Sequence, residues 1–303
     1  MATRSKMRIG VIGTGVLGGA IGRCLLEARY SLVVHDRRRE AAEEVCALGA
    51  AWASSPRAVA EISQVVMTAV PGPQELEELF FSPEHGLLPA MTPGQGYIDV
   101  STSSPDLARR IAAACQSRSV DFIDAPMSGL PPDATIMIGG DAAAVARYHR
   151  LFDALGEHVV HVGETGAGCV SKLVSQYLAC ANFIAAVEGL LIAAKAGVDL
   201  GLVGKTIPCT AGASRFFHLL PSSVFDGTFQ SRGTLDILTK DMDLACQLAD
   251  EFGVPPRIGM IVREVLGSAQ ARGWGQRGFP VAARVLEEIA GVELRAPRQD
   301  PES

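Results

Sequence analysis

The sequence has no surplus of basic residues. Its 303 residues include 27 Lys plus Arg against 33 Asp plus Glu, which gives a formal net charge of −6 and a pI near 5.6. A protein that coats nucleic-acid phosphates needs a positive field, so we expect no nucleic-acid partner. Apolar residues make up 48% and charged residues 20%, which argues against disorder and allows a sizeable core. The length suits two domains of ordinary size.

Disulfide patterns and grouped metal ligands are also lacking. The seven cysteines form no C-x-x-C motif, and none stands at metal-ligand spacing from the six histidines. His158 and His161 come nearest to a cluster, but a three-residue offset would place them on opposite faces of a strand. The sequence therefore predicts neither a disulfide framework nor a metal site.

Long uncharged apolar runs are missing as well. Residues 9–22 are interrupted by glycines, and no A-x-A cleavage site follows them before Arg23. The most apolar later stretch, residues 173–194, contains a glutamine, an asparagine and a glutamate. We therefore expect a soluble, cytoplasmic protein with no membrane partner.

What the first half does contain is an alternation of two patterns. Short Val- and Ile-rich runs predict strands, and the segments between them carry apolar residues at helical spacing. This alternation is typical of βαβ units in a mainly parallel, doubly wound sheet with helices on both faces. We assign residues 1–165 to such an α/β Rossmann domain. The predicted strands are 7–12, 31–35, 64–70, 96–100, 120–124, 135–139 and 158–162, and the predicted helices include 39–48, 73–80 and 105–117.

The second half is predicted to be all-helical. Residues 169–188 contain neither Gly nor Pro, and a helix continuing to Lys195 would be roughly 40 Å long. A small domain does not need such a helix, so we expect it to join two domains. Residues 166–292 are predicted to form a substrate and oligomerisation domain, and residues 293–303 a flexible tail. The other predicted helices are 200–207, 235–252, 257–272 and 281–290.

A glycine-rich motif follows the first predicted strand. Gly13, Gly15 and Gly18 form G-x-G-x-x-G directly before a helix, the arrangement that binds a dinucleotide. Its glycines provide a tight turn, a close approach to pyrophosphate and close packing of helix on strand. The pyrophosphate would lie on the N–H groups where the helix starts, at Val16 and Leu17.

The residue after the second predicted strand bears on the choice of cofactor. Asp36 can accept hydrogen bonds from ribose hydroxyls and repels a 2′-phosphate, which favours NAD. The adjacent Arg37, Arg38 and Arg39 point the other way, since guanidinium groups bind phosphate well, unless they are a solvated helix start. We predict NAD as the favoured cofactor and keep NADP as the alternative.

Lysine is rare in this chain, with five among the 27 basic residues. An ammonium group can exchange its proton at working pH, whereas a guanidinium cannot. Lys172 lies one turn into the long predicted helix, and Gln176 shares its face at i+4. By itself such a lysine is most simply a surface residue of an amphipathic helix.

Further motifs point away from that simple interpretation. The segments are DVSTSSP (99–105), DAPMSG (124–129), GETGAGCVSK (163–172) and TKDMDLA (239–245). Together with the glycine motif, and in this order, they resemble the β-hydroxyacid dehydrogenase family, which includes 3-hydroxyisobutyrate dehydrogenase and tartronate semialdehyde reductase. The resemblance extends over roughly residues 7–290.

The resemblance implies an NAD(P)-dependent oxidoreductase with its active site in a cleft between a Rossmann domain and a helical domain. Lys172 takes the role of general acid/base. Ser128, Gly129 and Leu130 would hold the substrate carboxylate through backbone N–H groups. Gln176 would contact substrate, Lys240 would lie beside both cofactor and substrate, and Val70, Pro71 and Thr102 would border the cofactor.

This sequence departs from the family pattern near the expected substrate. Gln176 stands where the family usually has Asn, Leu130 replaces a glycine, and the loop after Gly129 is about five residues shorter. Gly233 stands where the family often has Phe. We expect a larger or less polar β-hydroxyacid, or a carbonyl compound without the usual carboxylate.

Two other functions remain open at this point. One is an imine reductase on the same scaffold, although those relatives usually lack the lysine. The other is a non-catalytic NAD(H)-binding oligomeric scaffold, which would need no proton-transfer group. In each case we expect a homodimer or homotetramer, because the long apolar helix and the small second domain cover each other poorly.

Overall fold

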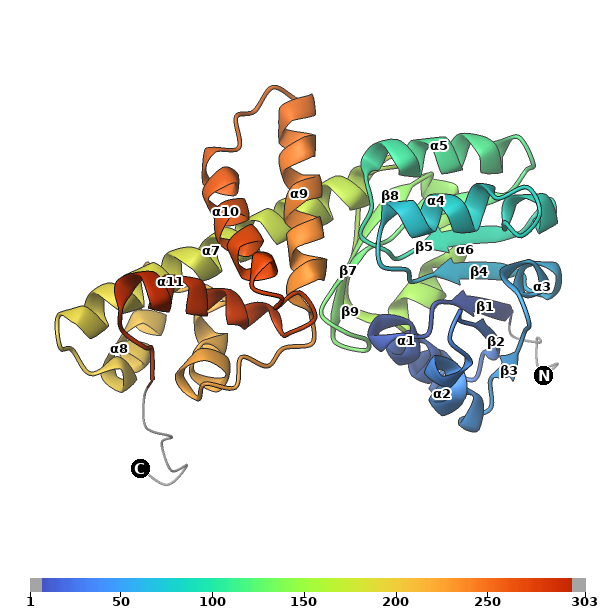
Figure 1. The fold of residues 1–303 in the computed structure, drawn as a ribbon. Helices are drawn as coiled ribbons and strands as arrows, with labels where there is room; N and C mark the ends of the chain where they lie inside the picture. The colour runs from blue at the N-terminus through green and yellow to red at the C-terminus, as the bar shows by residue number, and fades with distance from the viewer. Residues whose placement is uncertain (1–6, 296–303) are drawn as a thin grey trace. The chain divides into compact units, whose positions relative to one another are not determined.

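The computed structural model describes residues 7–295 (Figure 1). Its contacts divide the chain into two units, with the division between Lys172 and Leu173. The first unit contains a sheet and the second is built from helices, which confirms the predicted fold class.

Within the described residues the first unit forms one nine-stranded sheet in the order β3-β2-β1-β4-β5-β6-β8-β7, with β9 paired to β8. The strands from β3 to β6 in this order are parallel, and β8 runs antiparallel to β6 and β7. The sheet is therefore mainly parallel, as the alternating pattern predicted. The strands are β1 (Arg8–Ile12), β2 (Ser31–His35), β3 (Ala51–Trp52), β4 (Val65–Thr68), β5 (Gly96–Asp99), β6 (Asp121–Asp124), β7 (Met127–Ser128), β8 (Ala134–Gly140) and β9 (Gly156–Gly163).

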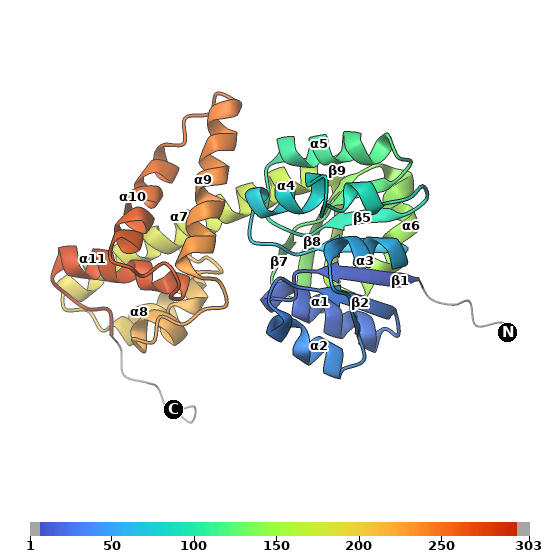
Figure 2. The ribbon, with the colours of Figure 1, turned by 45° about the vertical axis from the view of Figure 1, so that its right-hand side comes forward.

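Helices cover both faces of this sheet (Figures 1 and 2). Successive side chains of a strand point to opposite faces, so Val11 belongs to one apolar core and Ile12 to the other. One core is completed by α1, α2 and α6, and the other by α3, α4 and α5. The helices are α1 (Val16–Glu27), α2 (Glu43–Ala47), α3 (Pro56–Ile62), α4 (Pro73–Phe81), α5 (Pro105–Gln116) and α6 (Ala142–Asp153).

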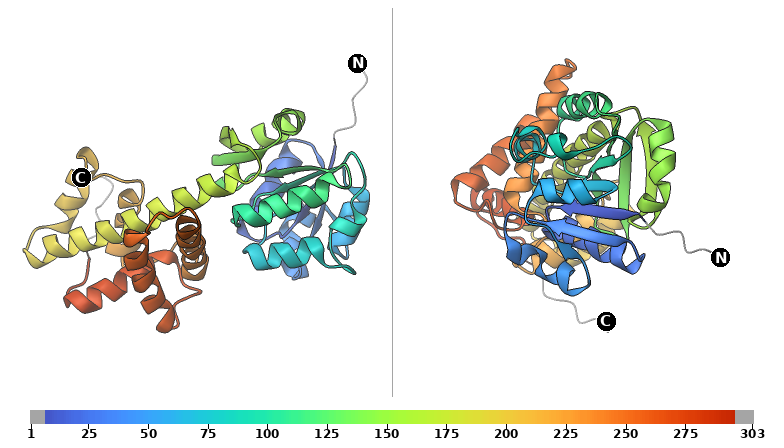
Figure 3. Two further views of the ribbon diagram at one scale, coloured as in Figure 1. Left: turned by 90° about the horizontal axis from the view of Figure 1, so that it is seen from above. Right: turned by 90° about the vertical axis from the view of Figure 1, so that its right-hand side faces the viewer.

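The helix α7 (Ala167–Lys195) begins in the first unit and continues into the second (Figure 3, left). It is the one described helix that is long and apolar enough, by length and composition alone, to cross a membrane. Its Phe183, Ile184 and Val187 are buried in the core of the second unit, as in the core helix of a globular domain. That core is completed by α8 (Leu200–Thr206), α9 (Leu235–Glu251), α10 (Arg257–Ala271) and α11 (Ala283–Ala290).

Some element boundaries differ from the prediction. The helix predicted over 39–48 is a 3₁₀ turn, Arg39–Ala42, followed by α2, and the one predicted over 281–290 begins with a 3₁₀ turn at Phe279–Ala282. Within the predicted tail, Leu294 is fully buried and Arg295 pairs with Glu287 at 2.7 Å. The rest of the predicted tail, residues 296–303, lies outside the described residues.

Candidate active site

The glycine motif forms the turn between β1 and α1. Gly13 has φ +86°, and its N–H donates to the His35 carbonyl at 2.9 Å. A Cβ atom at Gly13 would lie 2.2 Å from the Ala69 carbonyl oxygen, and one at Gly18 would lie 1.8 Å from that of Gly13. A Cβ at Gly15 would meet no atom within 4 Å. Gly13 and Gly18 are thus required by the fold, whereas Gly15 leaves exposed backbone beside open space.

This turn fits a dinucleotide. In the described structure the N-cap residue of α1 is Gly15, which gives no side-chain cap, whereas Ser104 caps α5 and Asp141 caps α6. The first N–H groups of a helix carry a partial positive charge, so the start of α1 can bind pyrophosphate. An uncapped helix start next to a glycine without side-chain neighbours leaves room for the phosphates to approach the backbone.

Asp36 follows β2 and lies against the same turn. Its Oδ2 accepts a hydrogen bond from the Thr14 N–H at 2.8 Å, and its Oδ1 accepts one from the Arg38 N–H at 2.9 Å. Arg37 and Arg38 are exposed, and the Arg39 guanidinium lies over the Trp52 ring at 5.1 Å. Asp36 is therefore held in place at the end of β2, and Arg39 packs on an aromatic ring.

The other predicted cofactor residues follow the next strands of the sheet. Val70 and Pro71 come after β4, and Thr102 comes after β5. The Val70 N–H donates to the Ser101 hydroxyl at 3.0 Å, which links the two segments. Because β2, β1, β4 and β5 are adjacent and parallel, the residues that follow them lie along one edge of the sheet. In doubly wound sheets this carboxyl edge is where ligands bind.

A buried carboxylate lies beneath this edge, at the end of β5. Asp99 is 2% exposed, and its Oδ1 accepts hydrogen bonds from the Thr68 hydroxyl at 2.7 Å and the Ser101 N–H at 3.2 Å. Burial raises the pKa of the Asp99 carboxyl from 3.8 to about 6, although the hydrogen bonds from Ser101 and Thr68 act in the opposite direction. The Asp99 carboxyl is therefore protonated at a higher pH in the folded protein than in the unfolded chain.

We expect Asp99→Asn to stabilise the protein above pH 6. The folded-state pKa is raised, so the stability that protonated Asp99 contributes is full below pH 3.8 and is lost as the pH rises through about 6. A shift of this size corresponds to about 3 kcal/mol. Asn keeps an acceptor for both hydrogen bonds and cannot ionise. Urea unfolding at pH 4 and pH 8 should show a gain over the wild type at pH 8 only; the same difference at both values would contradict the prediction.

The predicted carboxylate loop follows β7. Ser128 ends this strand and lies opposite Thr135 of β8. Gly129 has φ +85° and is exposed, and Leu130 is half-buried. The positive φ at Gly129 starts the turn out of β7, and β8 begins at Ala134.

Lys172 lies in the second turn of α7, and it is 7% exposed. The start of this helix is tied to the end of β6. The Gly166 N–H donates to Oδ1 of Asp124 at 2.8 Å, and the Cys169 N–H donates to its Oδ2 at 2.9 Å. Lys172 is therefore a buried lysine on a turn that begins at the carboxyl edge of the sheet, not a surface residue.

The two predicted substrate residues of the second unit share a partner. The Gln176 Nε2 donates to Oδ2 of Asp241 at 2.6 Å, and the Lys240 ammonium pairs with its Oδ1 at 2.7 Å. Asp241 is 2% exposed. Sequence reasoning did not single out Asp241, although it lies next to Lys240 in the TKDMDLA motif. This buried carboxylate brings Gln176 of α7 and Lys240 of α9 together.

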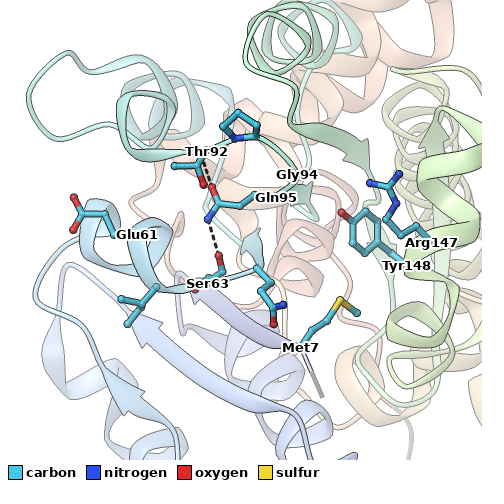
Figure 4. Close-up of a pocket in the computed structure, with 11 residues that line it drawn as sticks. Met7, Glu61, Ser63, Thr92, Gly94, Gln95, Arg147 and Tyr148 are labelled. Carbon is cyan, nitrogen blue, oxygen red and sulfur yellow. Dashed lines mark hydrogen bonds between the residues drawn. The ribbon is translucent and has the colours of Figure 1, made fainter. Parts of the chain in front are cut away.

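A separate cavity of about 480 Å³ lies at the opposite, amino edge of the sheet (Figure 4). The Gln95 side chain there donates to the carbonyls of Ala60 and Ser63 and accepts from the Thr92 N–H. Arg147 and Tyr148 both bond Asp121, at the start of β6. These polar groups serve the fold, and none of the predicted site residues lines this cavity.

Comparison with known proteins agrees with the motifs. Residues 8–163 match the family described as the NAD binding domain of 6-phosphogluconate dehydrogenase. Residues 166–286 match the family described as NAD-binding of NADP-dependent 3-hydroxyisobutyrate dehydrogenase. The two matches together extend over nearly all of the described chain.

Individual relatives align along the same length. The chain is 30% identical to a probable mitochondrial 3-hydroxyisobutyrate dehydrogenase-like protein of Arabidopsis thaliana, over 97% of this chain and 89% of the relative. It is also 30% identical to 2-hydroxy-3-oxopropionate reductase of Escherichia coli, over 95% of this chain and 100% of that enzyme.

Solved structures share the fold. The crystal structure of 3-hydroxyisobutyrate dehydrogenase from Salmonella typhimurium has a TM-score of 0.83 at 28% identity, covering 92% of this chain and 100% of that one. An imine reductase from Myxococcus stipitatus has a TM-score of 0.63 at 19% identity, covering 92% and 99%, a likeness that shows the fold alone. The chain therefore belongs to the β-hydroxyacid dehydrogenase family and is an NAD(P)-dependent oxidoreductase of that family.

Proposed function

We propose that Lys172 is the general acid/base of a β-hydroxyacid dehydrogenase. The observation that carries this proposal is its burial on a helical turn anchored at the carboxyl edge of the sheet, where Gly15, Asp36 and Thr102 also lie. Burial disfavours a charged amine, and a base that works near neutral pH needs this effect. The first unit is then the dinucleotide-binding domain, and the second supplies substrate contacts and subunit contacts.

The reaction requires a hydride transfer and a proton transfer. When bound, the nicotinamide ring supplies or accepts the hydride. In the oxidation direction the neutral Lys172 amine takes the proton of the substrate hydroxyl as the carbonyl forms. In the reduction direction its ammonium polarises the carbonyl and returns the proton.

The remaining residues would hold the substrate. The backbone N–H groups of Ser128, Gly129 and Leu130 would bind a carboxylate. Gln176 would contact the hydroxyl or a polar substituent, with its amide orientation fixed by the bond to Asp241. Lys240 would place a positive charge beside substrate and cofactor, held by the same carboxylate.

We propose a substrate larger or less polar than 3-hydroxyisobutyrate. Support comes from Leu130, whose half-buried side chain adds apolar surface to the carboxylate loop. Gly233 makes less room than its lack of a side chain suggests, because a Cβ there would lie 2.8 Å from Cδ2 of Leu238. Leu238 thus fills part of this space, and the added apolar surface at Leu130 is the main basis for the altered preference.

We propose NAD as the preferred cofactor. The Asp36 carboxylate is fixed at the end of β2, where it would face the ribose hydroxyls and repel a 2′-phosphate. Of the three arginines that argued for NADP, Arg39 lies over the Trp52 ring. Arg37 and Arg38, which are exposed like Arg39, then form a solvated segment before the 3₁₀ turn.

A panel of β-hydroxyacids of graded size, each assayed with NAD and with NADP, tests these proposals. We expect kcat/KM to rise with the size of the apolar substituent, and to be higher with NAD for each substrate. One missing methylene in an apolar pocket typically costs about 10-fold or more in kcat/KM. Highest efficiency on 3-hydroxyisobutyrate would refute the substrate proposal, and higher efficiency with NADP would refute the cofactor proposal.

We further propose that the enzyme is a cytoplasmic homodimer or homotetramer. Large apolar side chains of α7 are exposed in the single chain, among them Leu178 at 53% and Ile192 at 72%. Contiguous exposed apolar surface marks contact sites between proteins. Light scattering on the purified protein would give the subunit number, and a monomeric mass would refute the proposal.

A further inference from the structure

The residue before α7 is a glycine. Gly166, which precedes the helix, has no side chain that could accept a hydrogen bond. The first four N–H groups of a helix have no partner within it, and a neighbouring Ser, Thr, Asp or Asn usually accepts from one of them. This helix carries Lys172, so what holds its first turn matters for the reaction.

A carboxylate from a distant strand replaces the missing cap. Asp124, at the end of β6, is fully buried and accepts from the N–H groups of Gly166 and Cys169, one on each oxygen. These donors lie 42 and 45 residues further along the chain. A buried carboxylate that accepts two backbone hydrogen bonds fixes both the position and the rotation of the turn that donates them.

Two glycines keep this carboxylate in close contact with its surroundings. A Cβ at Gly139 would lie 2.6 Å from Oδ1 of Asp124, and a Cβ at Gly168 would lie 2.8 Å from its Oδ2. Any side chain at either position would displace the Asp124 carboxylate. The backbone of β8 and that of α7 therefore both close directly on Asp124.

Lys172 lies three residues after Cys169, so the two residues share a face of the helix one turn apart. A rotation or shift of the first turn would move the Lys172 amine with it. Misplacing a catalytic group by about 1 Å can cost on the order of 100-fold in rate. The rigid bond between β6 and α7 is thus suited to keep the amine aligned.

We propose that Asp124 is a positioning residue for Lys172: it fixes the first turn of α7 to the end of β6 and thereby sets the place of the catalytic amine. This inference rests on the proposed role of Lys172. Asp124 itself takes no part in the transfer of the proton.

The test is a double-mutant cycle of Asp124→Asn and Lys172→Ala. In the Asp124→Asn variant the amide oxygen can accept one hydrogen bond, but the amide nitrogen then meets the second N–H donor. We expect Asp124→Asn to lower kcat about 10- to 100-fold, with KM and NADH affinity unchanged within about twofold. In the Lys172→Ala background, with methylamine added to raise the residual rate, the same substitution should change kcat by less than about twofold.

Asp121→Asn is the matched control. It removes a carboxylate from the other end of the same strand, where Asp121 bonds Arg147 and Tyr148. We expect its kcat per NADH-binding site to equal that of the wild type. A purely structural role of Asp124 would reduce the number of NADH-binding sites and leave kcat per site unchanged, and this result would overturn the proposal.

The cycle also separates the two hypotheses. Near-normal turnover of Lys172→Ala would refute the proposed function. Suppose instead that Lys172→Ala loses most of its turnover. If Asp124→Asn then lowers the residual kcat by the same factor as in the wild type, the positioning role alone is refuted. Should Asp124→Asn fail to fold, amide hydrogen exchange of the wild-type enzyme provides the test. The Cys169 amide should exchange as slowly as the interior amides of α7. Exchange at the rate of an unfolded chain would overturn the proposal.

Discussion

Lys172→Ala should lower kcat by about 10²- to 10⁴-fold, the usual contribution of a general acid/base, while NADH binding stays within about threefold of the wild type. The lysine is buried on a turn held by Asp124, and removing its amine takes away the group that we propose exchanges a proton with the substrate. The glycine turn that we propose as the cofactor site keeps all its own hydrogen bonds. Steady-state kinetics and fluorescence titration with NADH would measure the two effects.

Two further variants sharpen this test. Lys195→Ala removes a lysine from the exposed end of the same helix and should leave kcat unchanged. Lys172→Arg keeps a positive charge but cannot release its proton at working pH. If proton transfer is the role, Lys172→Arg should lose about as much as the alanine variant. Wild-type turnover in either substitution of Lys172 would remove it from the mechanism.

Gly15→Ala should weaken NAD binding at least about 10-fold, a loss of about 1.4 kcal/mol in binding free energy. The stability of the fold should not change. The added Cβ meets no protein atom within 4 Å, and Gly15 has an ordinary negative φ of −63°. The methyl group would instead stand where the pyrophosphate approaches the backbone. Gly18→Ala should instead lower the free energy of unfolding, because its Cβ would lie 1.8 Å from the Gly13 carbonyl oxygen. Overpacking of this kind costs about 1–3 kcal/mol or more.

Gly19→Ala is the control for both variants. Its Cβ would lie 3.4 Å from the Thr14 carbonyl oxygen, an ordinary contact, and alanine favours a helix. Thermal unfolding and isothermal titration with NAD should therefore show no loss for this variant. Unchanged NAD affinity in Gly15→Ala would place the pyrophosphate away from this turn, and wild-type stability of Gly18→Ala would contradict the packing argument.

Local patterns in the sequence predicted the sheet well. The central strands β4 and β5 are apolar runs that are buried on both faces, so their pattern is strong, whereas β9 has no fully buried residue. The two-residue strands β3 and β7 were missed, because two residues are too few to show a period. The 3₁₀ turns before α2 and α11 were predicted as α-helix, because apolar residues three positions apart fit a single turn of either helix type.

The candidate site was predicted only in part. Gly13, Gly15 and Gly18 lie within one turn, so local spacing together with the preceding strand predicts a role for each. Asp124 accepts hydrogen bonds from residues 42 and 45 positions away, and Asp241 accepts one from Gln176, 65 positions away. Local sequence spacing cannot predict contacts at such separations. Both aspartates do lie in the DAPMSG and TKDMDLA segments, beside predicted site residues. This position marks them as candidates but does not identify the groups that they bond.

The attachment of α7 to β6 also bears on how this chain can be cut. Excision after residue 165, the predicted domain boundary, would remove both backbone donors of Asp124 and leave its carboxyl group without those hydrogen bonds, a costly state for a buried polar group. Continuing the piece through the second turn of α7 would retain them. Any chimera that borrows the nucleotide-binding half must therefore carry several residues of the long helix with it.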